Sequence, residues 1–185
     1  LIFILKQIIK METLTKTKWA IDPTHSDITF KVKHMMISTV TGHFEDFTAS
    51  IESEGDTFEN AEFEFSAKID SINTKNKDRD THLKSDDFFN AEEFPEMKFN
   101  STSFDGEALV GDLTIRDITK EVALSVDFNG IAVDPYGQTK AGFELEGTIH
   151  RKDYNLKWNA ITEAGNAVVA DKIKLALAVQ FVKQG

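Results

Sequence analysis

Residues 173–181 read Ile-Lys-Leu-Ala-Leu-Ala-Val-Gln-Phe, and every second residue of this stretch has a large apolar side chain. Because successive side chains of a β-strand point to opposite faces, this alternation predicts a strand with one apolar face and one face in water. The same period of two recurs at 28–34, 61–69, 122–128 and 143–149. The repetition predicts a domain built mainly from antiparallel strands.

Shorter apolar stretches at 44–51, 97–104 and 108–115 bring the expected total to about eight strands. Turn sequences such as Asp105-Gly106 separate the stretches, and short turns join antiparallel neighbours. The connection from 73 to 95 is the exception, because its length and its scattered apolar residues predict a short helical segment.

Eight antiparallel strands with one apolar face must close into a barrel or split into two packed sheets. Glycines at 42, 111, 142 and 147 lie within or beside the expected strands, where they permit the sharp bends of a small barrel. Closure also removes exposed sheet edges. We therefore expect an all-β, eight-stranded antiparallel barrel, with two packed sheets as the alternative.

The composition is that of a globular chain of one domain, with 185 residues, 41% hydrophobic and 28% charged. The 31 acidic residues outnumber the 21 basic ones, which gives a net charge of −10 and predicts that nucleic acid is not a partner. The absence of cysteine excludes disulfides, thiolate metal sites and cysteine nucleophiles. Fifteen Phe against two Tyr and two Trp predict a wide apolar interior.

The first residues differ in character from the rest. The apolar run at 1–5 is followed by Lys6 and lacks a small-residue cleavage site, so it is too short for a signal-peptide core or a membrane span. We expect Met11 to be the native start, 1–16 to be an N-terminal extension, and 17–185 to form the barrel domain. A truncated signal peptide or short surface anchor is the alternative.

Several segments resemble the YceI-like family, in family order and over nearly the whole expected domain. The ordered set is much more specific than any single segment. The matching segments are Trp19-Ala20-Ile21-Asp22-Pro23-Thr24-His25-Ser26 with 30–34, Gly42-His43-Phe44, Ser71-Ile72-Asn73-Thr74 with Arg79-Asp80-Thr81-His82-Leu83, Asp87-Phe88-Phe89 with Phe94-Pro95, Gly111-Asp112-Leu113-Thr114-Ile115, and Arg151-Lys152-Asp153-Tyr154.

The resemblance implies an extended lipocalin-like barrel that takes a long-chain amphiphile into its lumen: a polyisoprenoid, an isoprenoid quinone or a fatty-acid derivative. It implies no catalytic activity. Members of the family are commonly exported bacterial proteins, so a periplasmic location is the alternative to the cytoplasmic one that a start at Met11 favours. The chain departs from the family pattern at 154–156, where relatives tend to carry an aromatic residue followed by glycine.

The strand pattern nominates a set of inward side chains that would contact the apolar tail of a ligand. The alternative is that these side chains simply fill the barrel, because a barrel of this size either packs its interior or holds one small ligand. The set is Phe30, Val32, Phe63, Phe65, Val126, Phe128, Phe143, Leu145, Leu175, Leu177 and Val179.

A bound amphiphile also needs polar groups, since burying a head group without hydrogen bonds is costly. Arg79 and His82, in the long connection, are the first candidates, and Arg offers a planar fork of donors for phosphate, carboxylate or carbonyl oxygens. His34, on the expected inward face, His25 and Arg151 complete the head-group set. Each has a purely structural alternative, such as an ion pair, a loop anchor or a satisfied histidine.

The leading hypothesis is a non-enzymatic carrier or reservoir for a long-chain isoprenoid or acyl lipid, with no metal, no cofactor and no stable membrane insertion. The sequence is compatible with a monomer or a homodimer. A barrel enzyme that uses His82 and His34 as acid/base groups on a hydrophobic substrate is the first alternative. A structural or stress-related module with a filled core is the second.

Overall fold

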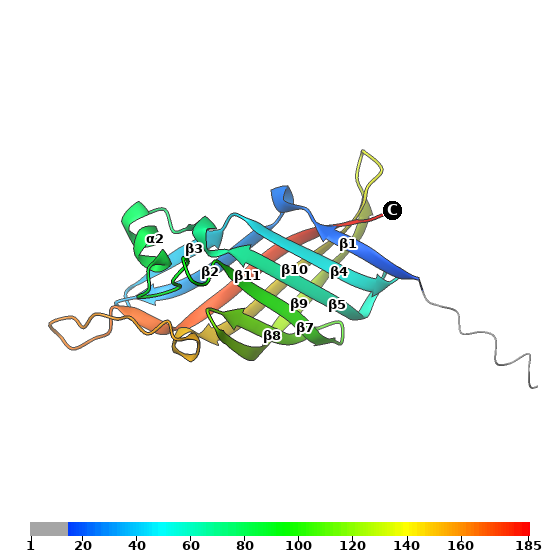
Figure 1. The fold of residues 1–185 in the computed structure, drawn as a ribbon. Coiled ribbons are helices and arrows are strands. Elements are labelled where there is room, and N and C mark those ends of the chain that lie inside the picture. Colours follow the sequence, from blue (N-terminus) through cyan, green and yellow to red (C-terminus); the bar gives the residue numbers. More distant parts are fainter. Residues whose placement is uncertain (1–14) are drawn as a thin grey trace, which may run out of the picture.

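The computed structural model describes residues 15–185, and the expectations about the segment before residue 15 lie outside this range. The chain forms an antiparallel β-barrel with one short α-helix at one end (Figure 1). The strands are β1 (Lys16–Ile21), β2 (Asp27–His34), β3 (Ser38–Phe44), β4 (Phe47–Glu54), β5 (Thr57–Lys68), β6 (Ile72–Asn73), β7 (Glu96–Phe104), β8 (Ala108–Ile115), β9 (Ile118–Val133), β10 (Thr139–His150) and β11 (Val169–Lys183). The helices are the α-helix α2 (Lys77–Lys84) and the 3-10 helices η1 (Pro23–His25), η2 (Ile69–Ser71) and η3 (Arg151–Tyr154).

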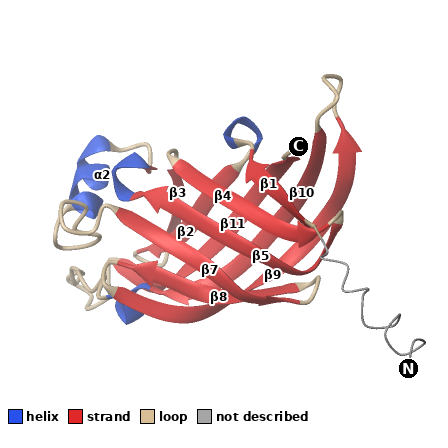
Figure 2. Cartoon of the chain, turned by 45° about the vertical axis from the view of Figure 1, so that its right-hand side comes forward, coloured by secondary structure: helices blue, strands red, loops and turns tan. Residues whose placement is uncertain are grey.

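The eleven strands make eight ribbons, because three ribbons are each interrupted once. Strands β1 and β2 pair with successive parts of β11 and form one ribbon. Strands β4 and β3 pair with β1 and β2 in turn, and β5 and β6 continue the pattern. The remaining ribbons follow in chain order up to β11, whose pairing with β1 and β2 closes the ring (Figure 2). The expected all-β, eight-stranded antiparallel barrel is confirmed.

The helical segment expected within 73–95 is also confirmed, and local chemistry explains where it begins. Asn76 precedes α2 in an extended conformation, and its side-chain oxygen accepts a hydrogen bond from the backbone N–H of Arg79 at 2.9 Å. This is an N-cap, which satisfies a backbone donor that has no partner within the helix. The connection thereby places α2 and the segment after it at one end of the barrel (Figure 1).

Two of the strand glycines leave room for aromatic rings, a reason that differs from the expected bending. Gly42 pairs with Phe30 across β2 and β3, and a Cβ at position 42 would lie 2.2 Å from the Phe30 ring. A Cβ at Gly111 would lie 2.5 Å from the ring of Phe99. The far edge of each ring therefore lies over the backbone of a neighbouring strand, in space that a larger residue at the glycine position would need.

The end of the barrel away from α2 is filled by aromatic rings. Phe58 lies at its centre, with ring-centroid distances of 5.1 Å to Trp19, 5.2 Å to Phe128 and 5.1 Å to Phe143. The indole N–H of Trp19 donates to Ser53 Oγ at 2.9 Å, so this buried polar group is satisfied. The interior is therefore packed solid at this end, and any hollow must lie toward α2.

Candidate ligand cavity

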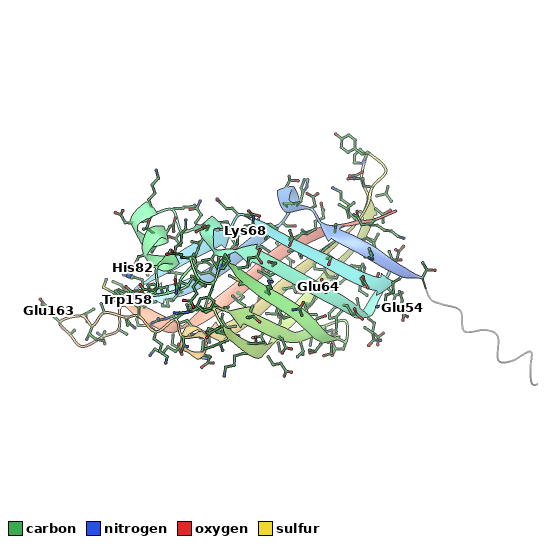
Figure 3. All side chains as sticks on the ribbon, viewed as in Figure 1. Glu54, Glu64, Lys68, His82, Trp158 and Glu163 are labelled. Atoms are coloured by element: carbon green, nitrogen blue, oxygen red, sulfur yellow. The ribbon has the colours of Figure 1, made fainter. Side chains whose placement is uncertain are left out.

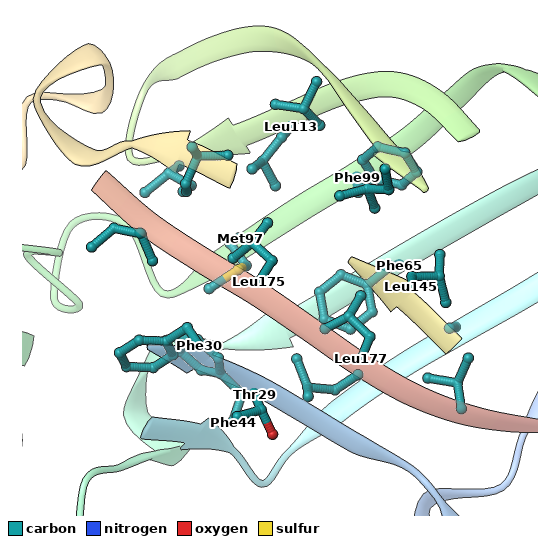
Figure 4. Close-up of a pocket in the computed structure, with 18 of the residues that line it drawn as sticks. Thr29, Phe30, Phe44, Phe65, Met97, Phe99, Leu113, Leu145, Leu175 and Leu177 are labelled. Atoms are coloured by element: carbon teal, nitrogen blue, oxygen red, sulfur yellow. The ribbon is translucent and has the colours of Figure 1, made fainter. Parts of the chain in front are cut away.

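An apolar cavity of about 190 Å³ lies inside the barrel, between the aromatic end and α2 (Figure 4). Of the thirty residues that line it, only Thr29, Glu64 and Arg151 are polar. For scale, an apolar cavity of about 150 Å³ stays free of water and accepts a benzene molecule. The space is therefore suited to an apolar guest and offers few groups that would hold water.

Eight of the eleven side chains nominated for the lumen line this cavity. They come from four strands on different sides of the barrel, so the cavity is enclosed by the ring rather than by one sheet. The eight are Phe30, Val32, Phe63, Phe65, Leu145, Leu175, Leu177 and Val179.

The other three nominated residues lie elsewhere. Val126 and Phe143 are buried, at 5% and 1% exposure, but do not line the cavity. Phe128 differs most from expectation, because its side chain is 45% exposed. Its ring covers the aromatic end of the barrel, 5.0 Å from the ring of Phe143 and 5.2 Å from that of Phe58. The alternation predicted the correct face of the strand for Phe128. Along the barrel, however, its ring lies beyond the cavity, among the rings that fill the aromatic end.

The sequence interpretation did not include the lining that comes from outside the strands. Leu83, Phe88 and Phe89 of the long connection line the cavity, as does Leu156 after η3. Apolar residues in an otherwise charged connection were the available signal, because such residues seldom lie in a segment that is fully solvated. These four side chains close the end of the barrel that carries α2. We call the segments 83–89 and 156–158 the cover.

His82 helps to hold this cover together. Its ring packs edge-on against Phe88 at 5.1 Å and against Trp158 at 4.6 Å, so it joins the segment after α2 to the segment after η3. Nε2 of His82 lies 2.8 Å from Oδ2 of Asp87. Figure 3 shows His82 and Trp158 together at this end. His82 therefore lies above the cavity, separated from it by Phe88, and does not line it.

Arg79 is engaged within its own connection. Its Nε donates to Thr74 Oγ1 and its Nη2 donates to the Thr74 carbonyl oxygen, both at 2.7 Å. Asp80 accepts from the backbone N–H of Thr74 at 2.9 Å, so both neighbours fasten the same residue. The Arg79 side chain does not line the cavity. This geometry matches the loop anchor that was the structural alternative for Arg79.

His25 and His34 do not approach the cavity either. His25 is exposed on η1, where its Nδ1 lies 2.9 Å from Oδ2 of Asp22. His34 is half-buried at the end of β2. None of His25, His34, Arg79 and His82 lines the cavity. The partners of His25, Arg79 and His82 are the nearby residues Asp22, Thr74 and Asp87.

Arg151 is the charged head-group candidate that does line the cavity. It is 2% exposed and donates four hydrogen bonds to backbone carbonyl oxygens. They run from Nε to Ala170 at 2.9 Å, from Nη1 to Leu156 at 2.5 Å and to Trp158 at 2.8 Å, and from Nη2 to Val169 at 3.0 Å. A guanidinium has five N–H donors, so one donor of Arg151 has no partner among the described residues 15–185.

Burial of Arg151 lowers the pKa of its guanidinium, and the negative charge of Asp171 acts in the opposite direction. Among residues 15–185, no carboxylate lies within salt-bridge distance of Arg151, so the backbone carbonyl dipoles carry out most of its neutralisation. A buried cation held only by neutral groups attracts a negatively charged or strongly polar ligand atom. Arg151 is therefore the one basic side chain among the residues that line the cavity.

Residues 15–185 contain no group of three or more His, Asp and Glu side chains arranged to hold a metal ion. Within that same range, none of the helices is long and apolar enough to cross a bilayer.

Residues 19–181 match the family model of the YceI-like domain. The chain belongs to the YceI-like family. Relatives include a UPF0312 protein of Staphylococcus aureus strain N315, 36% identical over 166 residues, and one of Staphylococcus epidermidis strain RP62A, 38% identical over 168 residues. Each alignment covers 89% of this chain and 97% of the relative. The resemblance seen in the sequence is thus confirmed.

Solved structures of YceI-like and related proteins share the barrel. The YceI protein of Campylobacter jejuni is 34% identical, with a TM-score of 0.70 over 83% of this chain and 90% of that one. Burkholderia cenocepacia BcnA matches with a TM-score of 0.73 at 18% identity, covering 86% and 98% of the two chains. A polyisoprenoid binding domain from Saccharophagus degradans matches at 0.68 and 12% identity, covering 90% and 98%. For the two structures at 18% and 12% identity, the likeness shows a shared fold alone.

Proposed function

We propose that this YceI-like domain binds one long-chain amphiphilic lipid, holds its tail in the barrel cavity, and acts as a carrier or reservoir for it. The observation that carries the proposal is the cavity lining, which is apolar except at Thr29, Glu64 and Arg151. Each methylene group moved from water into such a lining contributes about 0.8 kcal/mol. Affinity therefore rises with the length of chain that enters the barrel.

The extent of the lining supports a guest that lies along the barrel. Phe181 and Phe63 line the cavity beside the aromatic end, whereas Leu83 and Leu156 line it beneath the cover. A chain entering from the covered end would run past all of these side chains and stop at the aromatic rings around Phe58. The filled end thus sets an upper limit on the length of tail that is buried.

The charge at the covered end supports an amphiphile rather than a plain hydrocarbon. Arg151 lines the cavity and retains one N–H beyond its four carbonyl partners. Such a donor suits a phosphate, carboxylate or quinone oxygen. The likeness to a polyisoprenoid binding domain favours an isoprenoid tail, and a straight acyl chain is the alternative within the same class.

Mass spectrometry of organic extracts of the protein purified from its native cells tests the proposal directly. We expect a stoichiometric long-chain lipid. Fluorescence titration of the purified protein with a polyprenyl or fatty-acid probe provides the second test. Extracts without lipid, combined with no change in probe fluorescence, would overturn the proposal.

A matched pair of variants on β11 tests whether the cavity is the binding site. Leu175→Trp adds a large ring inside the cavity, and Lys174→Trp adds the same ring on the exposed face one residue away. We expect Leu175→Trp to weaken probe binding at least about tenfold, because the ring displaces methylene groups of the guest. Lys174→Trp should bind as the unmodified protein does. Equal binding by all three proteins would exclude the cavity as the site.

A further inference from the structure

The turn between β2 and β3 has an unusual combination of conformation and sequence. Met35 and Met36 both have positive φ angles, 48° and 60°, and the N–H of Ile37 donates to the His34 carbonyl oxygen at 3.1 Å. Two central residues with positive φ define a type I′ turn, for which Asn-Gly is the strongly preferred sequence. Large unbranched side chains seldom adopt this conformation. Asn and Gly at positions 35 and 36 would adopt the same backbone conformation with less strain than the two methionines.

The side chains at this strained turn point into solvent. Met35, Met36 and Ile37 are 37%, 68% and 80% exposed. Backbone strain of this kind persists mainly at functional sites, because elsewhere a better-suited residue removes it at no cost. The combination of strain with exposed apolar surface indicates that protruding apolar side chains are required here.

A fourth exposed apolar residue, Ile161, lies in the hairpin next to this turn. The N–H of Met35 donates to the Val168 carbonyl oxygen at 2.8 Å, and the hairpin containing Val168 is closed by an Ile161–Ala167 bridge. Ile161 is 68% exposed. We call Met35, Met36, Ile37 and Ile161 the apolar tip.

The apolar tip adjoins the covered end of the cavity. Val169 lines the cavity, and it pairs with His34, the residue directly before the two methionines. Trp158 and Leu156, which belong to the cover, lead into the hairpin that carries Ile161. A surface that contacts the apolar tip therefore also contacts the segments through which a guest would enter.

Charge is distributed unevenly between this end and the remainder of the barrel. The segments 33–39, 74–95, 115–118 and 150–172, which lie at the α2 end, contain ten Lys and Arg and ten Asp and Glu. The remainder of residues 15–185 contains nine Lys and Arg against twenty Asp and Glu. Lipid phosphates repel the acidic remainder, so the neutral end is the one that can approach a bilayer surface.

We propose that the apolar tip inserts into the interface of a lipid bilayer and thereby holds the covered end of the cavity against the membrane, where the guest enters and leaves. The inference rests on the proposed function, since it concerns how the lipid reaches the cavity. Short apolar protrusions bind bilayers weakly and reversibly, as delivery to and from a membrane requires.

The double variant Met35→Asn/Met36→Gly tests the inference without threatening the fold. It removes both methionines and introduces the sequence that a type I′ turn prefers, so we expect unchanged or higher stability in urea denaturation. Co-sedimentation with phosphatidylcholine vesicles, with and without phosphatidylglycerol, measures docking. We expect the variant to lose at least about tenfold in vesicle partitioning and to transfer a fluorescent fatty-acid probe between vesicles correspondingly more slowly.

Val133→Thr/Tyr136→Ser is the matched control, because these residues are 67% and 91% exposed at the turn between β9 and β10, at the opposite end. It should dock and transfer as the unmodified protein does. Equal loss in both variants would contradict a specific tip.

Equilibrium binding of the probe without vesicles separates this inference from the proposed function. If the tip variant binds the probe normally but docks poorly, the inference holds. If it docks and transfers normally while binding the probe, the inference fails and the proposed function stands. If the unmodified protein binds no probe, the proposed function fails whether or not the tip binds vesicles. Self-association that disappears in the tip variant, without vesicle binding, would assign the tip to a second copy of the chain instead.

Discussion

Nη1 of Arg151 donates to the carbonyl oxygen of Trp158 at 2.8 Å, and this bond ties η3 to the segment that covers the cavity. The same guanidinium reaches the carbonyl oxygens of Val169 and Ala170 at the start of β11. One buried side chain therefore fixes three parts of the chain at the end of the barrel where we propose that a lipid enters. Arg151 therefore both anchors this segment and lines the cavity.

Replacing Arg151 should destabilise the cover strongly. Arg151→Met leaves four carbonyl oxygens without their donor, and we expect a loss of about 3–5 kcal/mol in the free energy of unfolding, measured in urea. Arg151→Lys keeps the charge but not the fork of donors, and should lose less. A loss below about 1 kcal/mol for Arg151→Met would show that the carbonyl groups find other partners.

The neighbouring residue Tyr154 should respond in the opposite direction. Its side chain is 1% exposed, and among the described residues its hydroxyl has no hydrogen-bond partner. Tyr154→Phe removes a buried polar group that contributes no bond, so we expect an unchanged or higher free energy of unfolding at pH 7, by up to about 1 kcal/mol. A loss of more than that would reveal a partner for the hydroxyl.

Alkaline pH provides a second measurement on Tyr154. Burial raises the pKa of its hydroxyl to about 12, and the charge of Asp153 adds to the effect. An unfolded tyrosine titrates near pH 10, so the folded state is favoured below pH 10 and loses this contribution as the pH rises toward 12. The difference in stability between Tyr154→Phe and the unmodified protein should therefore increase in favour of the variant over this interval.

Asp22 should make stability depend on acid pH. The hydroxyl of Thr24 donates to its carboxylate at 2.7 Å, His25 lies 2.9 Å away, and Lys140 donates at 3.0 Å. These partners hold the pKa of Asp22 well below its usual range, although burial acts in the opposite direction. Its contribution is therefore present above about pH 4 and is lost as the pH falls further.

Asp22→Asn should lower the free energy of unfolding by about 1–2 kcal/mol at pH 7 and by progressively less between pH 4 and pH 2, in urea denaturation at each pH. Asp27→Asn is the control, because Asp27 is exposed and within residues 15–185 its side chain accepts no hydrogen bond. A difference for Asp22→Asn that stays constant with pH would contradict a role for its ionised form.

The fold was predictable because its signal is local. Each ribbon of the barrel shows the period of two, as in Leu175 and Leu177 on β11, and no distant residue is needed to read it. The interruption of the first ribbon at η1 was not predicted, although Asp22 and Pro23 are residues typical of such a break. The break between β3 and β4, at Glu45 and Asp46, lies inside the stretch 44–51 that the sequence predicted as one strand.

The cavity was less predictable because it depends on how side chains from all strands of the barrel pack together. Whether the barrel is hollow depends on the combined volumes of inward side chains, and the rings around Phe58 fill one end only. The surroundings of Arg151 come from carbonyl groups up to 19 residues away, and backbone carbonyls leave no mark in a sequence. Arg79 and His82 are residue types that could bind a head group. In the structure, however, they contact Thr74 and Asp87, which are close to them in the sequence.

The close contact between Gly42 and Phe30 links stability to the size of the cavity. Gly42→Ala places a methyl group where the Phe30 ring now lies, so the ring must move toward the cavity that it lines. We expect a loss of about 1–3 kcal/mol in the free energy of unfolding together with weaker binding of the fluorescent lipid probe. Phe30→Leu in the same chain should restore part of both, because the smaller side chain leaves room for the methyl group. Losses that simply add in the double variant would show that the two positions are not coupled and that the strain arises from the backbone at position 42 alone.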